Sequence, residues 1–80
     1  MREWTHRFVC YAKAHNRTPE LMLLDDEERF PGGKMTGYIC WNLEMIGKFL
    51  KERNAKHLYD VPDGQNEYDN WLAQQVENLN

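Results

Sequence analysis

The first helical stretch of the chain carries a histidine and a cysteine at a spacing that could serve chemistry. His6 and Cys10 are four residues apart, so on a helix both side chains lie on one face. Imidazole and thiolate are zinc ligands, and an imidazole held beside a thiol can also activate a nucleophile. Either use needs further fixed groups, and the chain contains neither a CxxC nor an HxxxH pair. We therefore predict no catalytic residue, no metal site and no cofactor, which makes the protein a non-enzymatic one.

The turn in the middle of the chain is a second place where chemistry could occur. Pro31-Gly32-Gly33-Lys34 precedes an apolar run, and the free N–H groups at a helix N-terminus can bind phosphate. The stretch lacks the spacing of a phosphate-binding loop, and no Ser or Thr follows the lysine. We interpret it as a structural turn that sets the angle between two helices.

Four consecutive acids form the third candidate. Asp25, Asp26, Glu27 and Glu28 point in all directions around a helix, whereas a catalytic pair converges on a cleft. We expect a solvated acidic face, and the sharper hypothesis is a surface that binds a basic partner. Four acids near the end of the chain would extend that surface, namely Asp60, Asp63, Glu67 and Asp69.

Length and composition limit the class of protein. Eighty residues make one helical domain, residues 1–80, and a domain of this size is stable only if it packs well or oligomerises. With 41% hydrophobic residues, among them three Trp, three Phe and four Tyr, the chain is far from the disordered class. Because 80 residues are unlikely to cover so many aromatic side chains alone, we also expect a homodimer.

Cysteine use and hydropathy indicate a compartment. Two cysteines, Cys10 and Cys40, are too few for a disulfide scaffold, so we expect reduced and buried thiols. No secretory h-region follows the N-terminus, and no apolar run reaches the roughly 20 residues of a membrane-spanning helix. We predict a cytoplasmic protein that does not enter a membrane.

Hydrophobic periodicity predicts an all-α fold, a small bundle of about four helices. The helices are expected at about 3–15, from Pro19 to just before Pro31, at about 35–54 and at about 66–79, with a single turn near 58–61. Thr18-Pro19-Glu20 is the clearest start signal, because it combines an N-cap, a proline at the first position and an acid in the first turn. The first helix should bury Trp4, Phe8, Tyr11 and Ala12. The second should bury a face defined by Leu21 and Leu24, which Met22 and Leu23 widen.

The third helix is predicted to be hydrophobic and central. Its apolar residues form two neighbouring rows, which implies cover on more than one side. The rows are Ile39, Leu43, Ile46 and Leu50, and Tyr38, Trp41, Met45 and Phe49. Gly37 and Gly47 interrupt the helix, so we expect each to admit a close neighbour. Tyr38, Trp41 and Met45 are the row with a candidate uncovered edge for a partner.

The stretch from Trp4 to Trp41 resembles a set of small uncharacterised proteins encoded by phages and prophages of proteobacteria. The similarity lies in an N-terminal Trp, the RF..YA segment, R-T-P-E, P-G-G, M-T-G followed by an aromatic residue, and a later D-x-W-L, here Asp69 to Leu72. Phe30 stands where a Trp is usual, and His15-Asn16 where a turn with glycine is usual. The resemblance implies a phage origin and no particular activity.

Two hypotheses on function follow. The first is a small phage-derived protein that binds another macromolecule, such as a host protein, in the cytoplasm of a bacterium. The alternative is a nucleic-acid-binding regulator with a helix-turn-helix-like arrangement of the second and third helices. The third helix would then read bases, but its first turns are MTGYICW and the helix before it is acidic, which argues against this alternative.

Overall fold

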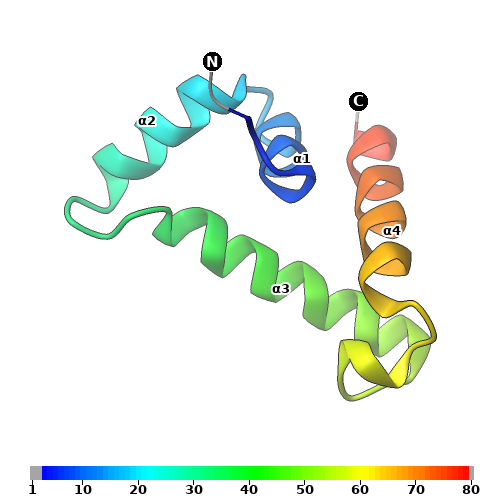
Figure 1. Cartoon of the computed structure of the whole chain (residues 1–80). Coiled ribbons are helices and arrows are strands. Elements are labelled where there is room, and N and C mark those ends of the chain that lie inside the picture. Colours follow the sequence, from blue (N-terminus) through cyan, green and yellow to red (C-terminus); the bar gives the residue numbers. More distant parts are fainter. Residues whose placement is uncertain (1–2, 80) are drawn as a thin grey trace.

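The computed structural model describes residues 3–79, which form four α-helices and one short 3-10 helix without a strand. The elements are α1 (His6–Ala14), α2 (Pro19–Arg29), α3 (Thr36–Arg53), the 3-10 helix η1 (Leu58–Asp60) and α4 (Gly64–Leu79) (Figure 1). The predicted all-α class and the four-helix count are confirmed, and the single turn near 58–61 is η1.

The end of α1 was predicted better than its start. Thr5 lies in extended backbone and its hydroxyl accepts a hydrogen bond from the N–H of Phe8 at 3.2 Å, so the helix begins at His6 and not near residue 3. Asn16 has the expected left-handed conformation, with φ of 61°. Phe8, Tyr11 and Ala12 are buried as predicted, and Trp4 is partly covered.

The start of α2 is where the sequence placed it, but its buried face is not. Thr18 caps the helix by accepting from the N–H of Leu21 at 3.3 Å. The prediction that Leu21 and Leu24 are buried is wrong, because they are 41% and 60% exposed. Met22, which was expected to widen the apolar face, is buried, and Asp26 is the other buried residue of α2.

Helix α3 contacts α1, α2 and α4, in line with its predicted central position. It starts after Met35 and ends before Asn54, both in the left-handed conformation with φ of 58° and 54°. Its burial is smaller than expected, since Phe49 is its one fully buried residue. The prediction that both apolar rows are covered is wrong for Ile39 and Leu43, which are 50% and 63% exposed.

The connection from α3 to α4 depends on a glycine. A Cβ atom added at Gly64 would clash with the carbonyl oxygen of Leu58, so this position admits no side chain. The close approach lets η1 pack against the first turn of α4. Asp60 fixes η1 by accepting from the N–H of His57 at 3.1 Å.

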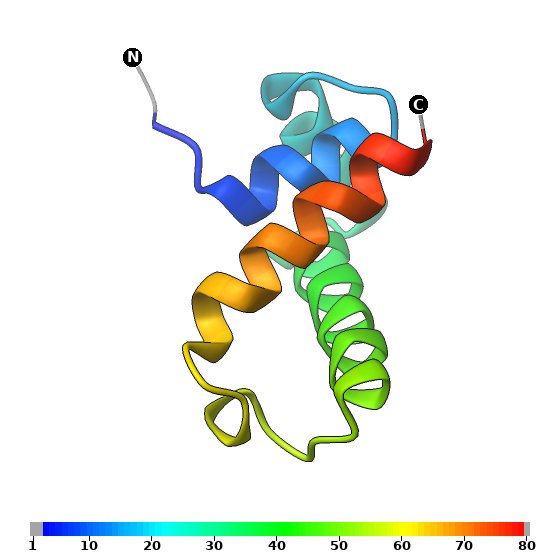
Figure 2. The same cartoon turned by 90° about the vertical axis from the view of Figure 1, so that its right-hand side faces the viewer.

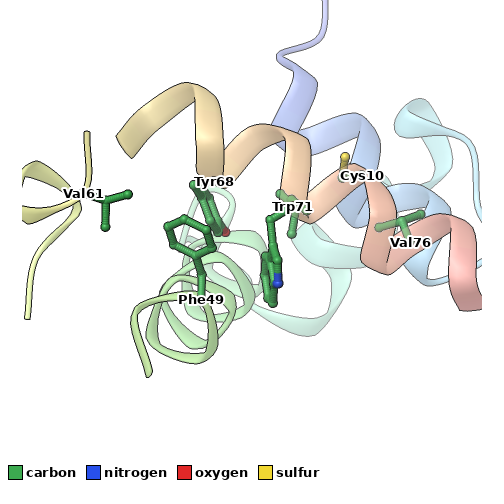
Figure 3. Close-up of a cluster of buried hydrophobic side chains, with 7 residues drawn as sticks. Cys10, Phe49, Val61, Tyr68, Trp71 and Val76 are labelled. Carbon is green, nitrogen blue, oxygen red and sulfur yellow. The ribbon is translucent and has the colours of Figure 1, made fainter. Parts of the chain in front are cut away.

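Two clusters of buried side chains form the core. The first cluster joins α1 to α2 and consists of Phe8, Tyr11, Ala12 and Met22. The second cluster joins α1, α3 and α4 (Figure 3) and consists of Cys10, Phe49, Val61, Tyr68, Trp71, Leu72 and Val76. Trp41 packs against both clusters and so links them.

The helices form an open arrangement. In Figure 1, α2 and α3 diverge from their connecting turn, and α1 and α4 lie toward the open side. In Figure 2, α4 crosses in front of α3 and beside α1, and α1 and α4 are also in contact. The radius of gyration is 13.3 Å, against about 11.6 Å for a compact domain of this length.

Candidate binding surfaces

Asp26 does not belong to a solvated acidic face. Its side chain is 1% exposed and accepts hydrogen bonds from the N–H groups of Gly37 at 2.7 Å and Tyr38 at 3.1 Å. These donors lie in the first turn of α3, whose N-cap residue Met35 provides no side-chain acceptor. A buried carboxylate on α2 therefore caps α3 and complements the positive end of its dipole.

The contact of Asp26 with the start of α3 argues against a phosphate site at the turn from Pro31 to Lys34. An anion at the start of α3 would need free N–H groups, and Asp26 already occupies those of Gly37 and Tyr38. The turn itself is formed locally, with Gly32 at φ of 82°. The anion at this helix end is supplied by the chain itself.

Gly37 makes the buried cap possible. A Cβ atom there would lie 2.6 Å from Oδ1 of Asp26 and 2.8 Å from the hydroxyl of Tyr11. The prediction that this glycine admits a close neighbour is confirmed. The corresponding prediction for Gly47 is wrong within the chain, because a Cβ atom there would meet nothing within 4 Å.

The other three acids of the run differ in their pairing. Arg17 donates to Asp25 twice, from Nε at 2.7 Å and from Nη2 at 3.0 Å, so this charge is neutralised. Glu27 and Glu28 are exposed, and neither forms an ion pair with any residue between positions 3 and 79. Only half of the predicted acidic face is therefore available to a partner.

Exposed apolar side chains accompany the two free acids. Leu24 lies one turn before Glu27 and Glu28 on α2, and Leu21 lies one turn before Leu24. We call Leu21, Leu24, Glu27 and Glu28 the α2 surface. A groove of about 480 Å³ adjoins it, lined by Leu23, Glu27, Phe30, Gly32, Gly33, Lys34 and Met35. The combination offers apolar contact beside two carboxylates that form no ion pair with the described residues.

Tyr38, Trp41 and Met45 face the core. All three are half-buried, and they pack against the buried clusters. The ring of Tyr38 lies 5.3 Å from that of Phe8, and the ring of Trp41 lies 5.3 Å from that of Tyr11. Trp41 and Met45 keep an uncovered edge, since they line a surface pocket of about 340 Å³ together with residues of α1 and α4. The apolar side chains that are exposed lie on the opposite face of α3.

The exposed face of α3 is apolar. Ile39, Cys40, Leu43 and Gly47 are exposed there, at spacings that place them side by side on the helix. We call these four residues the α3 outer face. Cys40 was predicted to be buried and is not, whereas Cys10 is buried, and both thiols are free.

The acids near the end of the chain are engaged within the fold. Asp69 accepts from Nε of Arg7 at 2.8 Å, and Glu67 lies 3.6 Å from Nη2 of Arg53. Asp63 accepts from the side chain of Asn66, and Asp60 caps η1. The extension of an acidic surface to this segment has little support.

His6 and Cys10 are brought together, but not as a catalytic pair. Nε2 of His6 lies 3.7 Å from the Cys10 sulfur and 3.0 Å from the carbonyl oxygen of Asp69. Because a carbonyl oxygen only accepts, this nitrogen carries its proton and cannot take one from the thiol. Burial raises the pKa of the Cys10 thiol above its ordinary value and outweighs the opposite effect of Lys13. The thiol is therefore a poor nucleophile.

Two further observations bear on function. Within residues 3–79, no three His, Cys, Asp or Glu side chains are grouped so that they could hold a metal ion. In the same part of the chain, no helix combines the length and the apolar character needed to cross a membrane.

The chain matches no protein-family model, no curated protein and no solved structure.

Sequence reasoning missed two features of these surfaces. The capping role of Asp26 had an indirect signal, because Met35 and Lys34 at the start of α3 cannot cap a helix through their side chains. The exposure of Leu24 and Leu43 had no local signal. It depends on which face of each helix the neighbouring helices cover.

Proposed function

We propose that this protein is a small non-enzymatic binding protein whose partner is a basic, amphipathic segment of another protein. The proposal rests on one observation, the α2 surface. There, Leu21 and Leu24 are exposed beside Glu27 and Glu28, which lack a cation within the described chain. Apolar side chains of a partner would bury the leucines, and its Lys or Arg residues would pair with the glutamates.

The groove beside the α2 surface supports the same kind of partner. Phe30 and Met35 supply an apolar lining, and Glu27 lies at both the groove and the surface. Methionine and aromatic side chains adapt to different apolar partners, which suits a groove that receives one anchoring side chain. The similarity of Trp4 to Trp41 to phage proteins makes a bacterial host protein the expected source of the segment.

The alternative of a nucleic-acid-binding regulator has less support. In a helix-turn-helix arrangement α3 would read bases, but its exposed residues Ile39 and Leu43 offer no hydrogen bonds to base edges. Two arginines near the N-terminus that could contact phosphates already form ion pairs within the chain, since Arg7 pairs with Asp69 and Arg17 with Asp25.

Affinity capture from a bacterial lysate tests the proposal. The wild type, Leu24→Asn, the double variant Glu27→Lys with Glu28→Lys, and the control Glu77→Lys should be compared by quantitative mass spectrometry. Glu77 is exposed on α4, a different helix from the one that carries the α2 surface. Loss of a central apolar contact costs about tenfold in affinity or more, so the first two variants should lose the partner and the control should keep it.

Salt dependence and direct binding complete the test. Capture that depends on the two glutamates should weaken as salt screens exposed charges. Retention of the same proteins by all variants, or capture of none by the wild type, would contradict the proposal. Binding to duplex or single-stranded DNA that falls steeply with salt would favour the alternative function.

A further inference from the structure

The α3 outer face has the sequence pattern of a helix-packing seam. Three of its residues, Cys40, Leu43 and Gly47, belong to a series that runs from Thr36 to Leu50 at intervals of four, three, four and three residues. This is the heptad spacing with which one helix packs along another. The two end residues of this seam are partly buried, and Leu50 also packs against the second cluster of the core. Nothing within residues 3–79 covers the centre of the seam, because Cys40, Leu43 and Gly47 are all exposed.

Within residues 3–79, no close contact accounts for the glycine at position 47. Glycine is among the least favourable residues in a helix interior, and Gly37 is explained by its contacts with Asp26 and Tyr11. At Gly47 a side chain would meet only open space. A glycine at the centre of an exposed apolar seam fits the close approach of a helix from outside the chain.

The surface area of the molecule has room for such a contact. Its accessible area is 5860 Å², whereas a compact monomer of 9.6 kDa has about 5100 Å². The excess, roughly 750 Å², is close to the area of about 800 Å² that each partner buries in a standard interface. The helices diverge in Figure 1, which is the arrangement expected of a chain with a large accessible area.

Charges at the edge of the seam indicate which helix fits. Glu44 comes first along this edge and Lys48 and Lys51 follow, all exposed, and Glu44 lies 3.8 Å from Lys48 in a loose contact. An edge that is negative first and positive later is complementary to a reversed copy of itself. An antiparallel copy also brings opposite ends of the two helix dipoles together.

We propose that the α3 outer face binds the same face of a second copy of this chain, antiparallel, about a two-fold axis close to Gly47. Such an axis puts Glu44 beside Lys48 and Lys51 of the second copy. It also puts Leu43 beside Leu50 of the second copy, while the two glycines let the helix backbones approach. The contact is independent of the α2 surface, so the two proposals can fail separately.

Two exposed leucines give a matched pair of variants. Leu43 on α3 and Leu24 on α2 are 63% and 60% exposed, so a lysine at either position is equally well solvated in the monomer. In sedimentation velocity over a concentration series, Leu43→Lys should raise the dissociation constant of the dimer at least about tenfold, and Leu24→Lys should leave it unchanged. In lysate capture, Leu24→Lys should lose the partner and Leu43→Lys should keep it.

Gly47 provides a second test in which folding and association change in opposite directions. Gly47→Ala should unfold at a higher denaturant concentration than the wild type when both are monomeric, and should dimerise less tightly. Gly47→Trp should abolish the dimer. Wild-type protein that sediments as a monomer at every concentration would overturn the proposal, as would an unchanged dimer in Leu43→Lys and Gly47→Trp.

Thiol reactivity reports on the same contact without a mutation. Cys40 lies on the seam and is exposed, whereas Cys10 is buried and serves as an internal reference. As the protein concentration rises through the dissociation constant, the labelling rate of Cys40 should fall and that of Cys10 should stay constant. A rate for Cys40 that does not change while the dimer forms would place the interface on another surface.

Discussion

The two faces of α3 are both apolar and lie in different environments. The inner face presents Tyr38, Trp41, Met45 and Phe49 to the buried clusters, and the outer face presents Ile39, Cys40 and Leu43 to solvent. Hydrophobicity alone does not distinguish them. The difference is set by α1 and α4, which contact α3 and cover one side of it.

Aromatic side chains explain why the inner face is the covered one. Phe49 packs against Tyr68 and Trp71 of α4, with ring centroids 5.6 Å apart in both pairs, and Tyr38 packs against Phe8 of α1. Large rings bury more area per residue than aliphatic side chains do. A helix with an aromatic row and an aliphatic row is thus expected to bury the aromatic row first.

The largest expected difference in stability is between truncations of one residue on each face of α3. Phe49→Ala should lower the free energy of unfolding by about 3–5 kcal/mol, because it leaves a cavity between α3 and α4. Leu43→Ala should change it by less than about 0.5 kcal/mol, since the side chain is 63% exposed. Urea unfolding at low protein concentration measures both. Similar losses in the two variants would mean that the two faces are equally covered in solution.

Asp25 and Asp26 are neighbours on α2, and their removal should differ in its cost to the stability of the fold. Asp26→Ala removes the acceptor of two N–H groups and should cost about 2–4 kcal/mol in the free energy of unfolding. Asp25→Ala removes an exposed pair with Arg17 and should cost at most about 1 kcal/mol. Circular dichroism during denaturation separates the two. Equal effects would show that the cap is not formed.

The two glycines of α3 should respond with opposite signs. Gly37→Ala forces a methyl group against Asp26 and Tyr11 and should destabilise by about 1–3 kcal/mol. Gly47→Ala meets no atom and should stabilise the monomer by up to about 1 kcal/mol, the difference in helix propensity. Thermal unfolding of the monomer checks the signs. Stabilisation by both changes would contradict the close packing at Gly37.

Alkaline pH should reveal the smallest difference, between the two cysteines. Burial raises the pKa of Cys10 in the folded chain above the value of about 8.5 in the unfolded chain, with Lys13 opposing and Asp69 adding to the effect. The unfolded state then binds fewer protons at high pH, so the stability that is present below about pH 8.5 is lost as the pH rises.

The expected loss by pH 9 is at most about 1 kcal/mol in the free energy of unfolding. Urea unfolding between pH 7.5 and pH 9 measures it. Cys10→Ala should remove this dependence, and Cys40→Ala should keep it, because the Cys40 thiol is exposed in the folded chain as well. A dependence that follows Cys40 would contradict the burial of Cys10.

Local signals predicted the helices well. The cap at Thr18, the proline at Pro19 and the left-handed residue at Asn16 are decided within a few residues, and the structure has all three. The start of α1 was missed because the cap at Thr5 lies within a stretch that also has helical periodicity. The helix class therefore followed from the sequence, and so did most helix ends, with the start of α1 as the largest error.

The orientation of α2 did not follow from the sequence, because a contact between helices decides it. Periodicity favoured Leu21 and Leu24 as the buried face, but Asp26 must turn inward to reach the N–H groups of α3. Once Asp26 faces the core, Leu21 and Leu24 are turned toward solvent, because they lie about 140° and about 160° from Asp26 around the helix. Both candidate binding surfaces arise from such choices between helix faces, so neither could be read from a hydrophobic pattern alone.

The position of Asp26 also affects which changes the chain between α2 and α3 can tolerate. The carboxylate joins the two helices directly, so the angle between them need not be encoded in the turn from Pro31 to Met35. Doubling the length of a flexible loop costs only about 0.6 kcal/mol in closure entropy. A longer turn is therefore expected to cost the fold little, whereas positions 26 and 37 are expected to tolerate few substitutions.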